Sequence, residues 1–222
     1  MAVIGFLLRR LASEYNLSCI TRAYMHSVIV AVGPWILLFL CLTSVTYIVI
    51  PITGIEETSE FMSVIAYNLF FSLILSGPIY LVSARYVADC LFLRDLSPVV
   101  GIYIMSLVYL LIPSFILSTV FYICVATMSP LTIILSVVNF MFLSQIWIIA
   151  LYLGSIRDFR AITLSWIIGM LITVFSSVQL GIAYGSNGML FGFNIGLIFT
   201  LDITGGYFGA VYFFMRGCGL IN

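Results

Sequence analysis

The stretch from 61 to 83 contains 23 residues without a charged side chain. As a helix rising about 1.5 Å per residue, it is long enough to cross the roughly 30 Å hydrocarbon core of a bilayer. Charged residues then follow together, since Arg85, Asp89, Arg94 and Asp95 all precede the next apolar stretch. This pattern predicts a membrane-spanning helix that ends at a charged surface.

The whole chain has a composition typical of such helices. Of its 222 residues 64% are hydrophobic and only 7% are charged, and the mean hydropathy is +1.27. A water-soluble domain with so few polar side chains could not cover its surface, so the composition predicts a polytopic membrane protein. The charges balance, and no basic cluster indicates nucleic-acid binding.

Six apolar stretches of membrane-spanning length follow one another along the chain. They lie at about 26–50, 61–83, 98–125, 131–153, 161–183 and 189–215. The segment 1–24 mixes charged and apolar residues without the long apolar run and cleavage site of a secretory signal, so we expect an amphipathic interfacial helix there. The expected fold is an all-α membrane protein, with a cytoplasmic interfacial segment at 1–24 and a six-span transmembrane domain at 25–222.

The arginines predict the orientation of these spans. All eight fall in the N-terminal segment, in the two connections on the same side, or after the last span: Arg9, Arg10, Arg22, Arg85, Arg94, Arg157, Arg160 and Arg216. The connections on the other side are short and either acidic or uncharged. Because cytoplasmic loops are enriched in Arg and Lys, both termini are expected in the cytoplasm.

Four segments of the chain resemble one known family. They are IGFLLRRL at 4–11, AVGPWIL at 31–37, LSGPIYLVSARYVADCLF at 75–92 and GSIRDFRAITL at 154–164. Together they resemble the PelG family, transporters of the Pel exopolysaccharide in the bacterial inner membrane, which belong to the multidrug/oligosaccharidyl-lipid/polysaccharide flippase superfamily. The resemblance implies that the six spans form one lobe of a MOP/MATE-like flippase, around a central cavity through which polysaccharide passes from cytoplasm to periplasm.

The resemblance also implies partners. Family members continue into a second six-helix lobe, whereas this chain stops at Asn222 after its sixth expected span, so we expect a second lobe or a homo-oligomer to complete the transporter. Other Pel synthesis proteins, including a cytoplasmic glycosyltransferase, are further expected partners. Two alternatives stay open: a non-transporting scaffold subunit of a polysaccharide secretion complex, and a flippase for another lipid-linked or amphipathic substrate.

Polar side chains inside the spans are costly and therefore informative. Asp202 lies 13 residues past Met189, about 20 Å along a helix, where an unpaired carboxylate costs roughly 2.5 to 3.5 kcal/mol. It is either a cavity carboxylate that contacts sugar hydroxyls, an amino sugar or a coupling proton, or a protonated or Arg-paired group that locks helices together. Five amides also lie in the spans: Asn68, Asn139, Gln145, Gln179 and Asn194.

Taken singly, each amide suits an interhelical hydrogen bond better than a substrate contact. As a set they would suit a hydrated sugar path. The substrate pathway predicted from these residues consists of Asp202, Asn68, Asn139, Gln145 and Asn194.

Breaks in two spans suggest a gate. Pro78 has no N–H for the carbonyl four residues back, and Gly77 lets the backbone bend; Gly33 and Pro34 form a similar pair in the first span. Arg85 and Asp89 follow the second break four residues apart, on one face of a continuing helix. The predicted gate or docking site consists of Arg85, Asp89, Gly77, Pro78, Gly33 and Pro34, although Gly and Pro are common in static spans too.

The tryptophans suggest packing or sugar contacts, and the sequence contains no catalytic motif. Trp35, beside Pro34, could stack on a sugar ring, whereas Trp147 and Trp166 are more simply packing or interface anchors. The single histidine, His26, and the scattered cysteines form no catalytic triad and no metal-ligand spacing, and no phosphate-binding loop is present. We therefore expect no catalytic residue, no metal and no cofactor.

Overall fold

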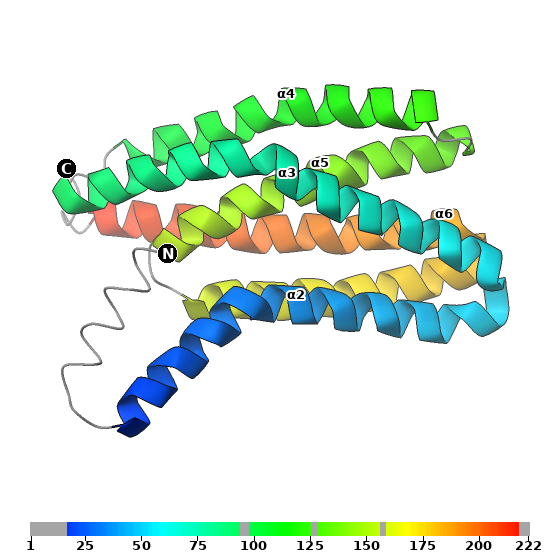
Figure 1. Cartoon of the computed structure of the whole chain (residues 1–222), viewed down its shortest axis with the longest axis horizontal. Helices are drawn as coiled ribbons and strands as arrows, with labels where there is room; N and C mark the ends of the chain where they lie inside the picture. The colour runs from blue at the N-terminus through cyan, green and yellow to red at the C-terminus, as the bar shows by residue number, and fades with distance from the viewer. Residues whose placement is uncertain (1–16, 94–97, 126–127, 156–158, 218–222) are drawn as a thin grey trace.

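The structure is a computed structural model that describes residues 17–93, 98–125, 128–155 and 159–217. Five helices, and no strand, occur in these ranges (Figure 1): α2 (Leu17–Thr53), α3 (Ile55–Leu93), α4 (Val99–Val125), α5 (Pro130–Ser155) and α6 (Phe159–Gly217). Each contains a stretch long and apolar enough to cross a membrane. The predicted all-α class is therefore confirmed, with five helices of membrane-spanning length in the described ranges where six spans were predicted.

Helix α6 is a hairpin of two helical arms, because Gly185 interrupts it with φ 63° and ψ −141°. Arms 159–184 and 186–217 run back along each other, the first yellow and the second orange to red in Figure 1. Their backbones touch at glycines: a Cβ added at Gly192 would lie 2.5 Å from the backbone of Ser177. The Ser176 hydroxyl donates to the carbonyl of Gly192 at 2.7 Å. Small residues at the contact thus let the arms approach closely.

Replacing Gly192 by alanine should destabilise the protein by about 1 to 3 kcal/mol, because backbone atoms of the facing arm cannot move aside for the new methyl group. The melting temperature in detergent measures this. Gly206→Ala is the matched control on the same helix, since a Cβ there meets nothing within 4 Å. An equal melting temperature for the two variants would contradict the close packing of the arms.

Helices α2 and α3 are joined by one residue, Gly54, with φ +91°. Its N–H donates to the carbonyl of Ile50 at 3.1 Å and closes α2, a conformation for which glycine is the usual residue. Glu56 and Glu57 then lie in the first turn of α3, where the helix dipole favours acidic side chains. The acidic connection expected at 51–60 is therefore mostly helical.

The N-terminal segment is described only in part. Of the expected interfacial helix at 1–24, residues 1–16 lie outside the described residues, and residues 17–24 belong to α2. Helix α2 therefore begins before the first expected span at 26–50. It bends in its N-terminal half (Figure 1).

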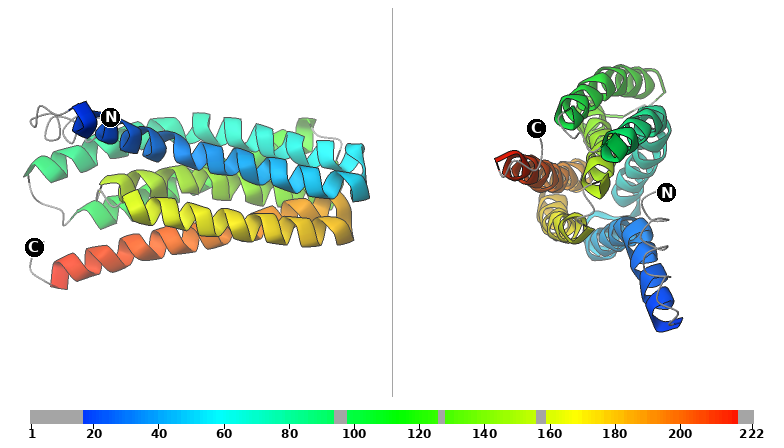
Figure 2. Two further views of the ribbon diagram at one scale, coloured as in Figure 1. Left: turned by 90° about the horizontal axis from the view of Figure 1, so that it is seen from below. Right: turned by 90° about the vertical axis from the view of Figure 1, so that its left-hand side faces the viewer.

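Helix α5 is the centre of the packing. It contacts α3, α4 and α6, and half of its apolar stretch is buried, against 22–33% in the other helices. Seen end-on in Figure 2, α5 lies between α3 and α4 on one side and the arms of α6 on the other, with α2 beside the first arm of α6. Large apolar side chains such as Phe39 and Tyr47 cover the outside, as lipid surroundings require.

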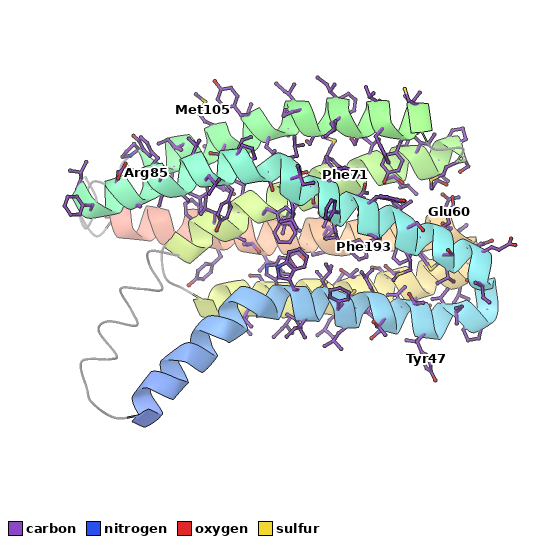
Figure 3. The ribbon with its side chains drawn as sticks, in the orientation of Figure 1. Tyr47, Glu60, Phe71, Arg85, Met105 and Phe193 are labelled. Atoms are coloured by element: carbon purple, nitrogen blue, oxygen red, sulfur yellow. The ribbon has the colours of Figure 1, made fainter. Side chains whose placement is uncertain are left out.

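Arg85 and the glutamates of α3 lie at opposite ends of the bundle. The α2–α3 turn, the α4–α5 connection and Gly185 lie at one end, and the first turns of α2 and the last turns of α6 lie at the other (Figure 1). Arg85 and Glu60, labelled in Figure 3, lie towards opposite ends. We call these the arginine end and the glutamate end.

Candidate functional site

Three of the four amides assigned to the substrate pathway hydrogen-bond one another. Asn68 donates through Nδ2 to Asn139 Oδ1 at 2.9 Å and to the carbonyl of Ser136 at 3.0 Å. Asn139 in turn donates through Nδ2 to Asn194 Oδ1 at 2.8 Å. The structure thus brings together side chains from α3, α5 and the second arm of α6, which we call the amide chain.

Both ends of the amide chain are closed by further partners. The Tyr122 hydroxyl of α4 donates to Asn68 Oδ1 at 2.6 Å, and Asn194 donates through Nδ2 to the carbonyl of Leu135 at 3.0 Å. Tyr122 and the three amides are each at most 3% exposed. Buried amides paired in this way hold membrane helices together. In this arrangement their donors and acceptors are engaged within the protein.

Gln145 and Gln179 lie apart from the amide chain. Gln145 of α5 donates through Nε2 to the carbonyl of Leu107 at 3.1 Å, which ties α5 to α4. Its Oε1 is buried and has no hydrogen-bond partner among the described residues. Gln179 is exposed on the first arm of α6. The pathway role of Gln145 therefore stays a prediction.

Asp202 stands by itself on the second arm of α6. It is exposed, whereas Asn194, eight residues earlier on the same arm, is buried. No hydrogen bond or ion pair to Asp202 occurs in the part of the chain that the structure describes. It lies 17 residues past Gly185, about 25 Å along the arm at 1.5 Å per residue. The bundle thus carries a carboxylate on its outer surface, well inside an apolar helix, and separate from the amide chain.

The gate residues lie on the two helices that diverge from the Gly54 turn. Arg85 and Asp89 are both exposed on α3, and no ion pair joins them in the described ranges. Pro78 lies inside α3, which stays helical on both sides of it. A Cβ added at Gly33 or Gly77 would meet nothing within 4 Å, so neither glycine is required by close packing.

Pro34 lies within α2, but its side chain falls outside the described side chains. Nothing in the packing around Gly33 and Gly77 distinguishes a moving helix from a static one. The gate and docking roles of both Gly-Pro pairs therefore stay predictions.

The three tryptophans of the chain form one cluster, which sequence reasoning missed. Trp35 of α2 stacks on Trp147 of α5, with ring centroids 5.1 Å apart and planes at 24°. The ring centroid of Trp147 lies 6.4 Å from that of Trp166 in the first arm of α6, and the two ring planes form an angle of 40°. Its Nε1 donates to the hydroxyl of Ser72 in α3 at 3.1 Å. We call these three residues the tryptophan stack.

No local spacing could have predicted this cluster, because Trp35 lies more than a hundred positions before Trp147 and Trp166 in the chain. Only their rarity is visible in the sequence, since the chain has three tryptophans among 222 residues. Each span begins or ends at a turn at the glutamate end. Residues separated from these turns by the same number of positions, here 17–19, therefore lie at a similar depth in neighbouring spans. All three tryptophans meet that condition, counted from Thr53, Pro130 and Gly185.

A small apolar pocket opens between α3, α4 and α5. Its volume is about 80 Å³, and the bond between Tyr122 and Asn68 lies at its wall. Aromatic rings form most of the remaining lining. The ring centroids of Tyr67 and Phe71 lie 6.2 and 5.8 Å from that of Phe121. The pocket is too small for a sugar residue with its hydration, and it offers almost no polar surface.

The three connections at the glutamate end are tied together by polar contacts. Glu57 Oε2 accepts a hydrogen bond from the backbone N–H of Ser186 at 3.0 Å, and a Cβ added at Gly185 would overlap the Glu57 carboxylate. Thr132, in the first turn of α5, donates to Asn187 Oδ1 at 2.8 Å. The α2–α3 turn and the start of α5 are therefore both anchored to the tip of the α6 hairpin.

The comparisons with known proteins point to one family. The family model PelG, described as "Putative exopolysaccharide Exporter (EPS-E)", matches residues 1–213. No curated protein and no solved structure matches the chain. In the described ranges no three His, Cys, Asp or Glu side chains gather as a metal site requires. The match covers nearly the whole chain and confirms the family that its four segments resemble: this protein belongs to the PelG family of exopolysaccharide exporters.

Proposed function

We propose that this chain is one lobe of an inner-membrane transporter that exports a Pel-type exopolysaccharide from the cytoplasm to the periplasm. Membership of an exporter family supports the substrate class. The observation that carries the proposal is the exposed carboxylate of Asp202, about 25 Å along an apolar arm. A carboxylate facing lipid at that depth is strongly disfavoured, so this face meets water or another protein.

Both possibilities lead to the same arrangement. If the face of Asp202 meets water, an aqueous path runs beside the lobe, and a second body must separate that path from lipid. If it meets protein, the second body contacts Asp202 directly. A second six-helix lobe or a second copy of this chain would serve in either case. The polysaccharide then crosses the membrane within this assembly of two bodies.

The hairpin of α6 supports the proposal of six membrane crossings. Its apolar stretch, Thr163–Ala210, has 48 residues and would be about 72 Å long if straight, more than twice the hydrocarbon core. Because the chain reverses at Gly185, each arm makes one crossing. Together with α2 to α5, this supports our proposal of six crossings, with the start of α2 and the end of α6 on one side, and the arginine rule supports placing that side in the cytoplasm.

Cysteine labelling tests this orientation. In a cysteine-free version, a cysteine at Ser59, which is exposed near the start of α3, should react with a membrane-impermeant maleimide on intact spheroplasts. A cysteine at Leu93, exposed at the other end of α3, should react only after permeabilisation. The reverse pattern would exclude the proposed orientation.

A scaffold role is the second candidate, and the amide chain favours it. Polar groups that serve only assembly should be paired among themselves, as Asn68, Asn139 and Asn194 are. In that case Arg85, Asp89 and their neighbours at the arginine end would hold cytoplasmic Pel synthesis proteins, and another subunit would form the path. The exposed Asp202 favours transport instead.

Export from cells tests the proposed function. Deleting the gene should abolish secreted exopolysaccharide while the polymer or its precursor accumulates inside, because synthesis continues without a path. Re-expression of the parent chain should restore secretion, and Arg85→Ala should restore membrane insertion without full secretion. Unchanged secretion in the deletion strain would refute the proposal, and loss of synthesis without accumulation would favour the scaffold.

A further inference from the structure

The tryptophan stack is built more rigidly than packing alone requires. The middle ring, Trp147, stacks on Trp35, lies at a tilt beside Trp166, and donates a hydrogen bond through Nε1 to Ser72. The Ser72 hydroxyl in turn donates to the carbonyl of Leu69 at 3.0 Å. Four helical segments therefore determine the orientation of one indole. An aromatic surface held in this way is preorganised for a flat ligand.

The stack is buried at one end and partly exposed at the other. Trp166 is 3% exposed and forms the closed end, whereas Trp147 and Trp35 are only partly buried. Helices α2 and α3 share the Gly54 turn but otherwise make few contacts, since α2 packs mainly on α6 (Figure 1). The two helices diverge from that turn towards the arginine end. Trp147 contacts Trp35 of α2 and Ser72 of α3, so these two partly exposed indoles lie at the seam between α2 and α3.

The depth of the stack separates it from an ordinary aromatic belt. Trp35 lies 18 residues before Thr53, and Trp147 lies 17 residues after Pro130, so both are about 26 Å from the glutamate end. Tryptophans that anchor a membrane protein face the lipid headgroups one by one. In this protein the three tryptophans instead contact one another across three helical segments. Asp202 lies at about the same depth, 17 residues past Gly185.

An indole face suits a sugar ring for a physical reason. The C–H groups on one side of a pyranose form an apolar, weakly positive surface, which complements the negative face of an aromatic ring. Such a contact slides easily from one sugar to the next, since it needs no directed hydrogen bond. A transporter that passes a repetitive polymer therefore gains a contact without a deep energy minimum.

We propose that the tryptophan stack is the platform on which sugar rings of the exported polysaccharide lie as the polymer passes the seam between α2 and α3. This inference rests on the proposed function. Trp35 contributes the face that the sugar meets, while Trp147 and Trp166 hold it in place. The platform contributes stacking, and hydroxyl-directed specificity comes from other groups.

Tryptophan fluorescence tests the platform directly, because every tryptophan of the chain belongs to the stack. The full chain in lipid nanodiscs is titrated with short oligosaccharides prepared by partial hydrolysis of the exopolysaccharide that the host secretes. We expect a saturable change in emission. Trp35→Leu should weaken binding about tenfold, equivalent to about 1.4 kcal/mol, while the variant stays folded in the nanodisc. Binding to that variant is measured by calorimetry.

Two further variants separate stacking from packing. Trp35→Phe keeps an aromatic face and should bind within about threefold of the parent. Phe39→Leu, on the same helix one turn away and 66% exposed, should bind as the parent does. An unchanged affinity in Trp35→Leu, or no emission change in the parent, would overturn the inference. Equal losses in Trp35→Phe and Trp35→Leu, with a lower melting temperature, would show that the stack serves only packing.

The export assay keeps this inference distinct from the function on which it rests. If deleting the gene leaves secretion intact, the proposed function fails. If deletion abolishes secretion but Trp35→Leu secretes as the parent does, only the platform fails. A reduced rate in Trp35→Leu, with normal rates in Trp35→Phe and Phe39→Leu, supports both.

Discussion

Replacing Asn139 by leucine should lower the stability of the protein by about 2 to 4 kcal/mol. The change removes the middle of the amide chain, where Asn139 accepts from Asn68 and donates to Asn194. It strands one donor of Asn68 and the Oδ1 of Asn194 in a dry interior, and an unsatisfied buried polar group costs about 1 to 3 kcal/mol. Two such groups would together cost at most about 6 kcal/mol. The expected loss of stability is smaller, because polar groups in a loosened bundle find other partners.

The melting temperature in detergent measures this effect. At about 2 to 4 °C for each kcal/mol in a chain of this size, the expected decrease is about 5 to 15 °C. Gln179→Leu is the matched control, since it also removes an amide from a span but at an exposed position. Equal decreases in the two variants, or none in Asn139→Leu, would mean that the amide chain contributes no stability.

Replacing Asp202 by asparagine or leucine should reduce polysaccharide export at least about tenfold, while the protein stays folded. The carboxylate is exposed and makes no hydrogen bond or ion pair within the described part of the chain, so its loss removes no contact of this lobe. It also relieves the cost of placing a charge deep in the membrane. The melting temperature should therefore equal that of the parent or exceed it.

Export and melting temperature are measured together for these variants in the complete transporter. Phe199→Leu serves as the control, because Phe199 is 46% exposed and lies three residues before Asp202 on the same arm. Full export by Asp202→Leu would end the assignment of Asp202 to the pathway. A lower melting temperature in both Asp202 variants would instead place its partner in the second body and make its role structural.

The sequence alone determined the class of the protein and the position of its helices. A membrane helix satisfies its own backbone hydrogen bonds and needs about 20 apolar residues, so its signal is local and lies in one continuous stretch. The apolar stretches near 61–83, 98–125 and 131–153 therefore became α3, α4 and α5. The family was equally visible, because it is carried by short continuous segments.

The connections between helices were less predictable. The acidic residues near 51–60 are polar enough for a loop, yet only Gly54 departs from helix there. Between the expected spans 161–183 and 189–215, the connection at 184–188 likewise requires only Gly185 to leave the helical conformation. In both places a single glycine adopts a positive φ, and the neighbouring polar residues take part in helix ends, as Glu57 does with Ser186. Composition reports polarity, but it does not report which residue makes the turn.

The partners of the polar and aromatic residues were decided only by the tertiary structure. The sequence identified Asn68, Asn139 and Asn194 but could not say whether they meet, since that depends on the rotation of each helix about its axis. The same holds for the tryptophan stack and for the exposed face of Asp202. Hydropathy sets which segments enter the bilayer, whereas close packing between uniformly apolar helices sets which of their faces meet.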